Sequence, residues 1–231
     1  MIGTKKTNEA KNGGSTELVF VLDRSGSMAG LESDTVGGFN GMLNKQRGND
    51  APCWVTTVLF DHERVTLHDR LPLRNVEALT SRDYQVRGST ALFDAIGETV
   101  RHIENVHRYI RPEDVPQTTL FVVITDGLEN ASRSWTRHAV RRLLDQKQEE
   151  GWEFIFIGAN IDAVEAASDI GIRADRAVNY RADSRGTAAV YRSVSCAVDE
   201  ARRCMPMSSD WRSDVDADFS ARSGKDRRKK K

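Results

Sequence analysis

The sequence predicts an α/β fold: a doubly wound, mostly parallel sheet with one antiparallel edge strand and helices on both faces. Two observations predict it, namely near-continuous apolar runs and the helical patterns that lie between them. Apolar runs of four to seven residues are typical of strands that are covered on both faces, as in a parallel sheet. Strands that alternate with helices form βαβ units, from which such a sheet is built.

Four apolar runs mark the expected buried strands, and they are residues 18–22, 54–60, 120–124 and 154–157. Residues 64–71 follow a tight turn at Asp61 and alternate more, which favours an antiparallel strand at the edge of the sheet. A short sixth strand is expected at 177–180.

Helices are expected between these strands. Apolar residues between Leu92 and Ile103 recur at helical spacing and predict a helix with one core-facing stripe. A weaker stripe lies over 36–43, where two glycines loosen it. Ser132 is predicted to cap a helix over 133–150. Two further helices are expected over 161–170 and 187–203.

The ends of the chain differ from its middle. Residues 1–16 are predicted to be a flexible leader, 17–203 a single domain, and 204–231 a disordered tail with a basic end. The formal net charge of zero divides unevenly: residues 225–231 hold six basic side chains and one acidic one, or +5, so residues 1–224 carry −5. The body of the protein is therefore mildly acidic.

Composition excludes several classes of protein. With 39% hydrophobic residues the 231-residue chain is too apolar for a disordered protein, and no apolar run is long enough to span a membrane. Three scattered cysteines argue against a disulfide framework and against a zinc ribbon. The first 16 residues contain no apolar signal region, so a cytoplasmic protein is expected.

Polar oxygen-bearing residues gather where the predicted strands end. Asp23, Ser25 and Ser27 follow the first strand, Thr90 precedes the helix at 92, and Asp126 follows the strand at 120–124. The carboxyl ends of parallel strands lie at one edge of the sheet, where ligands bind. Carboxylates and hydroxyls are hard ligands, which favour Mg²⁺ or Mn²⁺ over zinc. We therefore expect a Mg²⁺ or Mn²⁺ site where these strands end.

These segments resemble the von Willebrand factor A (vWA) domain, in the form of its stand-alone prokaryotic members. Residues 20–28, Phe-Val-Leu-Asp-Arg-Ser-Gly-Ser-Met, are similar to the family's metal-ion-dependent adhesion site (MIDAS). Residues 88–92, Gly-Ser-Thr-Ala-Leu, look like its threonine loop, and residues 121–127, Phe-Val-Val-Ile-Thr-Asp-Gly, like its second signature strand. The resemblance covers about residues 17–203 and implies a Rossmann-like sheet.

The resemblance also implies a function. Ser25, Ser27 and Thr90 would bind the metal through their hydroxyls, and Asp23 and Asp126 directly or through water. The metal would be Mg²⁺, with Mn²⁺ or Ca²⁺ as alternatives. An Asp or Glu of a partner protein would complete the coordination. Similar prokaryotic proteins work beside phosphatases, kinases or ATPases in stress or defence modules, so such a partner is expected.

Other polar residues fit structural roles better. Asp61 is expected to be a turn residue that pairs with Arg64, and Asn160 or Asp162 to cap a helix rather than contact the ligand. Trp135 is expected to pack at the start of a helix. The five histidines have no ligand spacing.

A non-enzyme is expected, because no nucleophile–base pair accompanies the predicted metal ligands. The alternative is a Mg²⁺-dependent phosphohydrolase that uses the same site, with Asp23 as a phosphotransfer aspartate. Against it, Ser25 stands where haloacid-dehalogenase-like phosphatases carry a second Asp, and the chain has no phosphate-binding G-x-x-x-x-G-K-[ST] loop. Nucleic-acid binding through the basic end is disfavoured by the acidic body.

Overall fold

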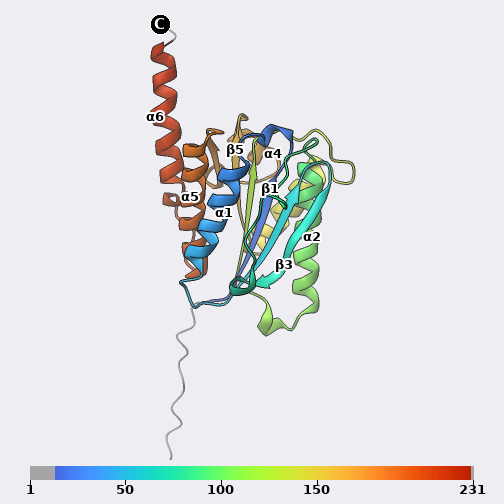
Figure 1. Ribbon diagram of the computed structural model, residues 1–231. Coiled ribbons are helices and arrows are strands. Elements are labelled where there is room, and N and C mark those ends of the chain that lie inside the picture. Colours follow the sequence, from blue (N-terminus) through green and yellow to red (C-terminus); the bar gives the residue numbers. More distant parts are fainter. Residues whose placement is uncertain (1–13, 230–231) are drawn as a thin grey trace, which may run out of the picture.

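The computed structural model describes the backbone of residues 14–229 and side chains as far as residue 222. Its centre is a six-stranded sheet in the order β3-β2-β1-β4-β5-β6 (Figure 1). Neighbouring strands are parallel except β3, which runs antiparallel to β2 at the edge. The strands are β1 Thr16–Asp23, β2 Cys53–Phe60, β3 Arg64–Pro72, β4 Thr118–Thr125, β5 Glu153–Ala159 and β6 Ala177–Tyr180. The predicted fold class is confirmed.

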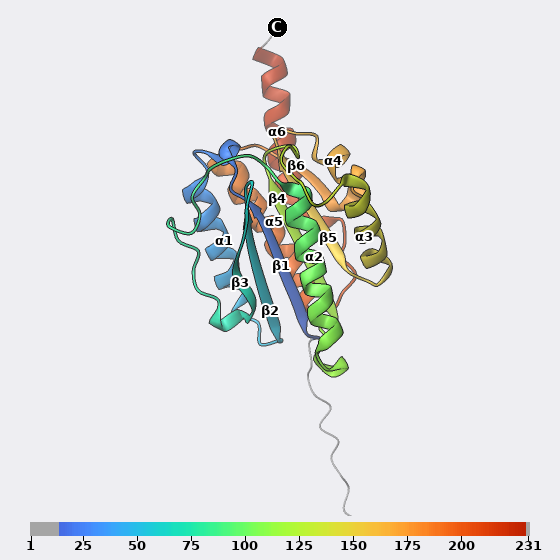
Figure 2. The same ribbon diagram turned by 90° about the vertical axis from the view of Figure 1, so that its right-hand side faces the viewer.

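Helices cover both faces of this sheet (Figures 1 and 2). One face carries α1 Glu32–Gln46, α5 Ser184–Arg202 and α6 Ser213–Lys229, whereas the other carries α2 Leu92–Tyr109, α3 Arg137–Glu149 and α4 Ala163–Asp169. The side chains of β1 divide between the two layers, because successive residues of a strand point to opposite faces. Phe20 and Leu22 pack under α1 and α5, and Val19 and Val21 pack under α2.

The predicted helix over 133–150 begins later than expected. Helix α3 starts at Arg137, and its cap is Thr136, whose hydroxyl accepts a hydrogen bond from the Ala139 amide at 3.2 Å. Ser132 instead accepts a hydrogen bond from the backbone amide of Asp94 at 3.0 Å, in the first turn of α2. Its hydroxyl thus serves an earlier helix, a contact between segments 38 residues apart that local sequence does not reveal.

The prediction of a disordered tail is wrong for residues 207–222. Trp211 is 1% exposed and its indole N–H donates to the Asp175 carbonyl at 3.2 Å. Val215, in the first turn of α6, is equally buried against the α5 face of the core. The few apolar residues of this segment are widely spaced, so their pattern gave no sign that they complete a core. Residues 1–13 of the predicted leader lie outside the described residues, and Thr16 already belongs to β1.

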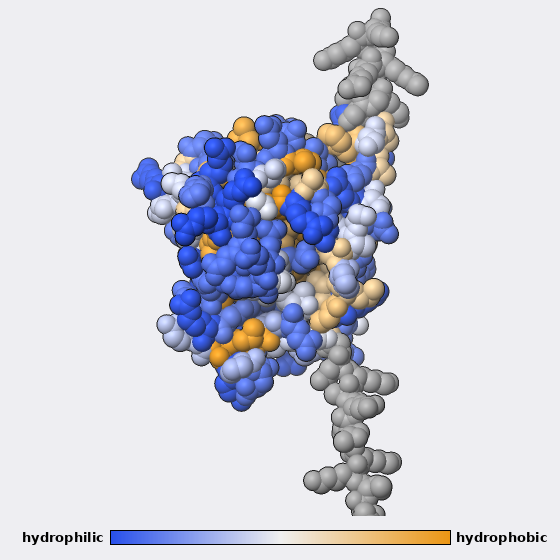
Figure 3. Space-filling model, turned by 180° about the vertical axis from the view of Figure 1, so that it is seen from behind, coloured by the Kyte–Doolittle hydropathy of each residue, from blue (hydrophilic) through white to orange (hydrophobic). Residues whose placement is uncertain are grey.

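One face of the molecule is largely polar. The face drawn in Figure 3 is mostly hydrophilic, with hydrophobic side chains in small separate groups. Within residues 14–229, no helix combines the length and the apolar character needed to cross a membrane.

Candidate metal centre

The polar residues predicted from the sequence meet at the carboxyl ends of β1 and β4, in the middle of the sheet. From β1 the chain continues to β2 on one side, whereas β4 lies on its other side, so the strand order changes direction here. Such a switch point leaves a crevice at the strand ends, where ligands bind in open α/β sheets. Asp23 is the last residue of β1 and Asp126 follows directly on β4.

A chain of short hydrogen bonds links the first loop to the second. The hydroxyl of Ser27 donates to Asp126 Oδ1 at 2.5 Å, and the Ser25 and Ser27 hydroxyl oxygens are 3.1 Å apart. Asp23 is held from two sides: its Oδ1 accepts from the Ser25 amide at 2.7 Å, and its Oδ2 accepts from the Thr125 hydroxyl at 2.5 Å. The structure therefore brings Asp23, Ser25, Ser27 and Asp126 together as predicted.

Thr90 joins them across Gly127. A Cβ built on Gly127 would lie 3.2 Å from Thr90 Oγ1 and 3.3 Å from Ser27 Oγ, so both hydroxyls converge on the space that this glycine leaves open. The Thr90 backbone is fixed by Asn130, whose side-chain oxygen accepts from the Thr90 amide at 2.9 Å. All five predicted ligands thus surround one small region.

The donor set fits a divalent cation. Asp126 is 2% exposed, and its Oδ2 is a buried oxygen with no hydrogen-bond partner among the described residues. Leaving a buried carboxylate oxygen unpaired is costly, and a bound cation is one way to satisfy it. Two carboxylates and three hydroxyls are all oxygen donors, the chemistry that Mg²⁺ prefers.

Burial changes the acidity of both carboxyl groups. It raises the pKa of Asp23 to about 6, although the hydrogen bonds from Thr125 and Ser25 oppose the increase. Burial likewise raises the pKa of Asp126, opposed by the Ser27 hydroxyl. The protein thus holds two carboxylates where their negative charge is unfavourable, and a bound cation would offset that charge.

Asp61 holds two of the loops that surround the candidate metal centre. The predicted ion pair between Asp61 and Arg64 is not formed. The carboxylate of Asp61 lies 2.9 Å from Nε of Arg24, in the first loop, and 3.0 Å from Nε of Arg87, which directly precedes the loop of Thr90. Its backbone carbonyl accepts from the Ala91 amide at 2.8 Å. Arg64 instead pairs with Glu98. Asp61 therefore ties two ligand-bearing loops together.

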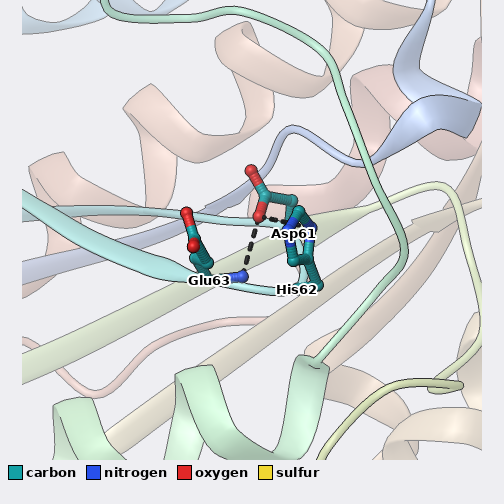
Figure 4. Close-up of side chains that lie close together, drawn as sticks. All are labelled: Asp61, His62 and Glu63. Carbon is teal, nitrogen blue, oxygen red and sulfur yellow. Dashed lines mark hydrogen bonds and ion pairs between the residues drawn. The ribbon is translucent and has the colours of Figure 1, made fainter.

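Asp61 also belongs to a second group of side chains with metal-binding chemistry, drawn in Figure 4. One ligand atom each of Asp61, His62 and Glu63 lies within 4.8 Å of the others, the one such cluster of His, Cys, Asp and Glu found in the part of the chain that the structure describes. However, Arg24 and Arg87 already neutralise Asp61, and Arg87 also pairs with Glu63 at 2.5 Å. We assign this cluster a structural role.

The remaining rim residues lie as expected or nearly so. Asp162 caps α4 by accepting hydrogen bonds from the amides of Val164 and Glu165, both at 3.1 Å. Asn160 has a positive φ of 57° and does not cap the helix. Trp135 packs with the core at the start of α3, where its ring lies against Gly97.

The sequence analysis missed Thr125 and Glu129. Thr125 holds Asp23, and Glu129 accepts from the amide of Phe93 at 2.8 Å and from that of Ser132 at 2.7 Å, which fixes the loop after Asp126. The role of Thr125 could have been inferred from its position, because it is a polar residue at the end of an otherwise apolar strand. For Glu129 no such signal exists, because its contact with Phe93 joins segments that are 36 residues apart in the sequence.

In the metal-free protein, the contribution of Asp23 to stability is expected to increase as the pH falls from about 7 to 4. The folded-state pKa of Asp23, about 6, exceeds its ordinary value of 3.8, so folding favours the protonated form. The resulting contribution is present below pH 3.8 and is lost as the pH rises through 6; at most it amounts to about 3 kcal/mol. Urea unfolding in a chelator would measure it as the difference between wild type and Asp23→Asn. A difference that does not change between pH 4.5 and 7.5 would contradict the expectation.

Comparison with known proteins identifies the fold. No family model and no curated protein sequence matches the chain. Among solved structures, the von Willebrand factor type A protein from Catenulispora acidiphila aligns with a TM-score of 0.53 and 14% identity over 80% of this chain and 42% of that one. The ArnB paralog VWA2 from Sulfolobus acidocaldarius aligns with a TM-score of 0.51 and 17% identity, over 80% and 45%.

A third similar structure carries a metal at its own site. Proximal thread matrix protein 1 from the mussel byssus, described with a zinc-occupied MIDAS motif, aligns with a TM-score of 0.53 and 15% identity over 80% of this chain and 46% of that one. The chain thus spans less than half the length of these three proteins. Because these alignments cover 80% of the chain with TM-scores above 0.5, the chain has the fold of a von Willebrand factor A domain.

Proposed function

We propose that this chain is a protein-interaction module that binds Mg²⁺ through Asp23, Ser25, Ser27, Thr90 and Asp126 and recognises an acidic residue of a partner protein. The observation that carries the proposal is the convergence of five oxygen-bearing side chains around a buried, unpaired carboxylate oxygen of Asp126. The mussel protein with zinc in its MIDAS supports a divalent ion at this place in the fold. Mn²⁺ and Ca²⁺ are further candidates, since both accept oxygen ligands.

The exposure of the ligands indicates how a partner would approach. Asp23, Ser25, Thr90 and Asp126 are buried, whereas Ser27 is exposed and Gly127 is half-buried. A metal held among them is therefore accessible from the side of Ser27 and Gly127. Mg²⁺ requires six ligands, so a carboxylate of a partner could take a position that the protein leaves open. Asp23 and Asp126 together balance the charge of a divalent ion. The carboxylate of the partner would therefore be held by direct coordination to the metal and not by a remaining net charge.

An apolar hollow beside the metal centre indicates what else the partner presents. Leu128, the second residue after Asp126, is 62% exposed. It borders a hollow of about 320 Å³ whose wall also includes Leu92, Phe93 and Ile161. An exposed leucine next to a shallow apolar hollow suits an apolar side chain of the partner. We therefore expect the acidic residue of the partner to have an apolar neighbour.

The structure favours binding over phosphoryl transfer. Both oxygens of Asp23 accept hydrogen bonds, from the Ser25 amide and from the Thr125 hydroxyl, and Ser25 stands where haloacid-dehalogenase-like phosphatases carry a second aspartate. The similar structures are described as vWA or matrix proteins, not as enzymes. We thus infer a non-catalytic role, in the cytoplasm, where the three free cysteines stay reduced.

Metal-dependent capture of partners tests the proposal. Wild type, Asp126→Ala and Asp162→Ala proteins would be immobilised and offered a lysate of the source cells in Mg²⁺, in EDTA, and in EDTA followed by excess Mg²⁺. We expect one or more proteins that wild type and Asp162→Ala retain in Mg²⁺, that EDTA releases, and that Asp126→Ala does not retain. Substitution of acidic residues in a captured protein should then abolish its retention. Equal recovery by all three proteins in Mg²⁺ and in EDTA would refute a metal-dependent contact.

A further inference from the structure

A hollow in the described part of the chain lies at the opposite end of the sheet from the candidate metal centre. It has a volume of about 480 Å³ and forms between the α1–β2 loop, the end of β3 and the end of α5. Strand β2 begins here at Cys53 and ends at Phe60, on the side of the metal centre. A concave space of this volume is in the range of small-molecule sites.

The hollow is lined by three arginines and one carboxylate. Arg47, Arg74 and Arg202 contribute three positive charges and Asp50 one negative charge, which leaves a net charge of +2 on its wall. The body of the protein as a whole carries negative charge, since residues 1–224 sum to −5. A positive hollow in a negative body is a local electrostatic feature that attracts anions.

None of these arginines has a carboxylate partner among the residues that the structure describes. Arg47 donates to the carbonyl of Val76 at 2.5 Å and to the side chain of Asn44, and Arg74 has no hydrogen bond to any described residue. In contrast, most arginines of the α2 and β3 region, such as Arg70 and Arg101, pair with a glutamate. Arg47 and Arg74 thus keep donors available for another anion.

Arg202 is the most informative of the three because it is buried, with 1% of its surface exposed. Its two Nη atoms donate only to neutral groups, at 2.8 Å to the Asn49 carbonyl, at 2.7 Å to the Ala51 carbonyl, and to Gln46. Its Nε has no hydrogen-bond partner in the described structure. A buried guanidinium without a counter-charge is costly, and an anion bound beside it would reduce that cost.

The other walls of the hollow are largely apolar and could contact the uncharged part of an organic anion. Trp54, Pro52, Pro72 and Leu73 provide an apolar and partly aromatic surface next to the arginines. The first 13 residues of the chain contain three lysines and one glutamate. Because their net charge is positive, like that of the hollow, they are not expected to bind in it. Guanidinium groups bind phosphate oxygens in a forked geometry, and several of them match a group with more than one negative charge.

We propose that this hollow is a binding site for a small phosphate ester of the nucleotide class, held through its phosphate by Arg47 and Arg74 beside the buried positive charge of Arg202, with its organic part against Trp54. The phosphate lies near the end of α5, and the ring or sugar lies along the wall formed by the start of β2 and the end of β3. The site is independent of the metal centre, which lies at the other end of the strands.

Calorimetric titration in EDTA tests the proposal, because the chelator removes any contribution of a metal. ADP is the probe, and adenosine, which lacks the phosphates, is its matched control. We expect ADP to bind wild type with a dissociation constant below 1 mM, adenosine at least about tenfold more weakly, and the double variant Arg47→Gln/Arg74→Gln to lose at least about tenfold in ADP affinity. Arg202 is left intact because its contacts hold the backbone.

Two further variants make the outcome specific. Arg142→Gln removes an exposed arginine of α3, and Asp126→Ala removes a metal ligand; both should bind ADP as wild type does. Circular dichroism would establish that the double variant is folded. No binding of ADP at millimolar concentration, equal affinity for ADP and adenosine, or a loss that Arg142→Gln shares would each overturn the site. Because the titration contains EDTA, none of these results bears on the proposed Mg²⁺-dependent function.

Discussion

Replacing Asp126 with alanine is expected to lower the affinity for Mg²⁺ by at least about a hundredfold, the largest effect that a single substitution at the metal centre should have. The variant loses one of two carboxylates in the donor set, including the buried oxygen that has no other partner in the described structure. It also loses the hydrogen bond that orients Ser27 at 2.5 Å. Calorimetry with MgCl₂ and MnCl₂ measures the change directly.

Thermal unfolding provides a second measurement of the same effect. A ligand at one hundred times its dissociation constant stabilises the folded state by about 2.7 kcal/mol, so Mg²⁺ should raise the melting temperature of wild type and not that of Asp126→Ala. Without metal the variant should be at least as stable as wild type, because burial raises the pKa of this carboxyl and makes its charged form unfavourable. The substitution therefore separates metal binding from folding.

Gly127→Ala is the complementary variant, because it keeps all five ligands. Its added Cβ would lie 3.2 Å from Thr90 Oγ1 and 3.3 Å from Ser27 Oγ, inside the space on which both hydroxyls converge. Mg²⁺ affinity should fall here too, whereas Asp162→Ala, at the rim, should lose only the cap of α4.

If Mg²⁺ raised the melting temperature of Asp126→Ala as much as that of wild type, these residues would not form the metal site.

The sequence was sufficient to predict the centre of the sheet and the five candidate ligands. Apolar runs that end in Asp23 or in Thr125 and Asp126 define both the buried strands and the edge where polar side chains meet. That inference needs only local patterns and the geometry of parallel strands. The structure brings these five residues close together because each lies within a few residues of a strand or helix end.

The surrounding contacts were not predictable in this way. Asp61 pairs with Arg24 and Arg87, which lie 37 residues before it and 26 residues after it, and not with nearby Arg64. The opposite charges alone allow all three pairings, and the fold decides among them. Ser132 shows the same limitation, since it serves α2 and not the helix that follows it. The partners of Asp61 and Ser132 are determined by which segments the fold brings together, and not by local sequence propensity.

The second large effect concerns the C-terminal segment. Trp211→Ala is expected to lower the free energy of unfolding by about 3–5 kcal/mol, the usual cost of truncating a large buried aromatic residue. Trp211 is 1% exposed, packs in the core on the α5 side of the sheet, and donates its indole N–H to the Asp175 carbonyl. The variant leaves a cavity and an unpaired carbonyl. Urea unfolding in EDTA, monitored by circular dichroism, measures the loss without a contribution from metal.

Tyr109→Ala is the matched control, because this aromatic side chain is 82% exposed at the end of α2 and its removal should change stability by less than about 0.5 kcal/mol. Trp211→Phe should recover part of the loss, since it refills most of the cavity but cannot donate to Asp175. A Trp211→Ala protein as stable as Tyr109→Ala would mean that the segment before α6 is not part of the core. A loss of several kcal/mol would instead place the folded boundary of this domain beyond residue 203, because a side chain outside the core has no such energy to lose.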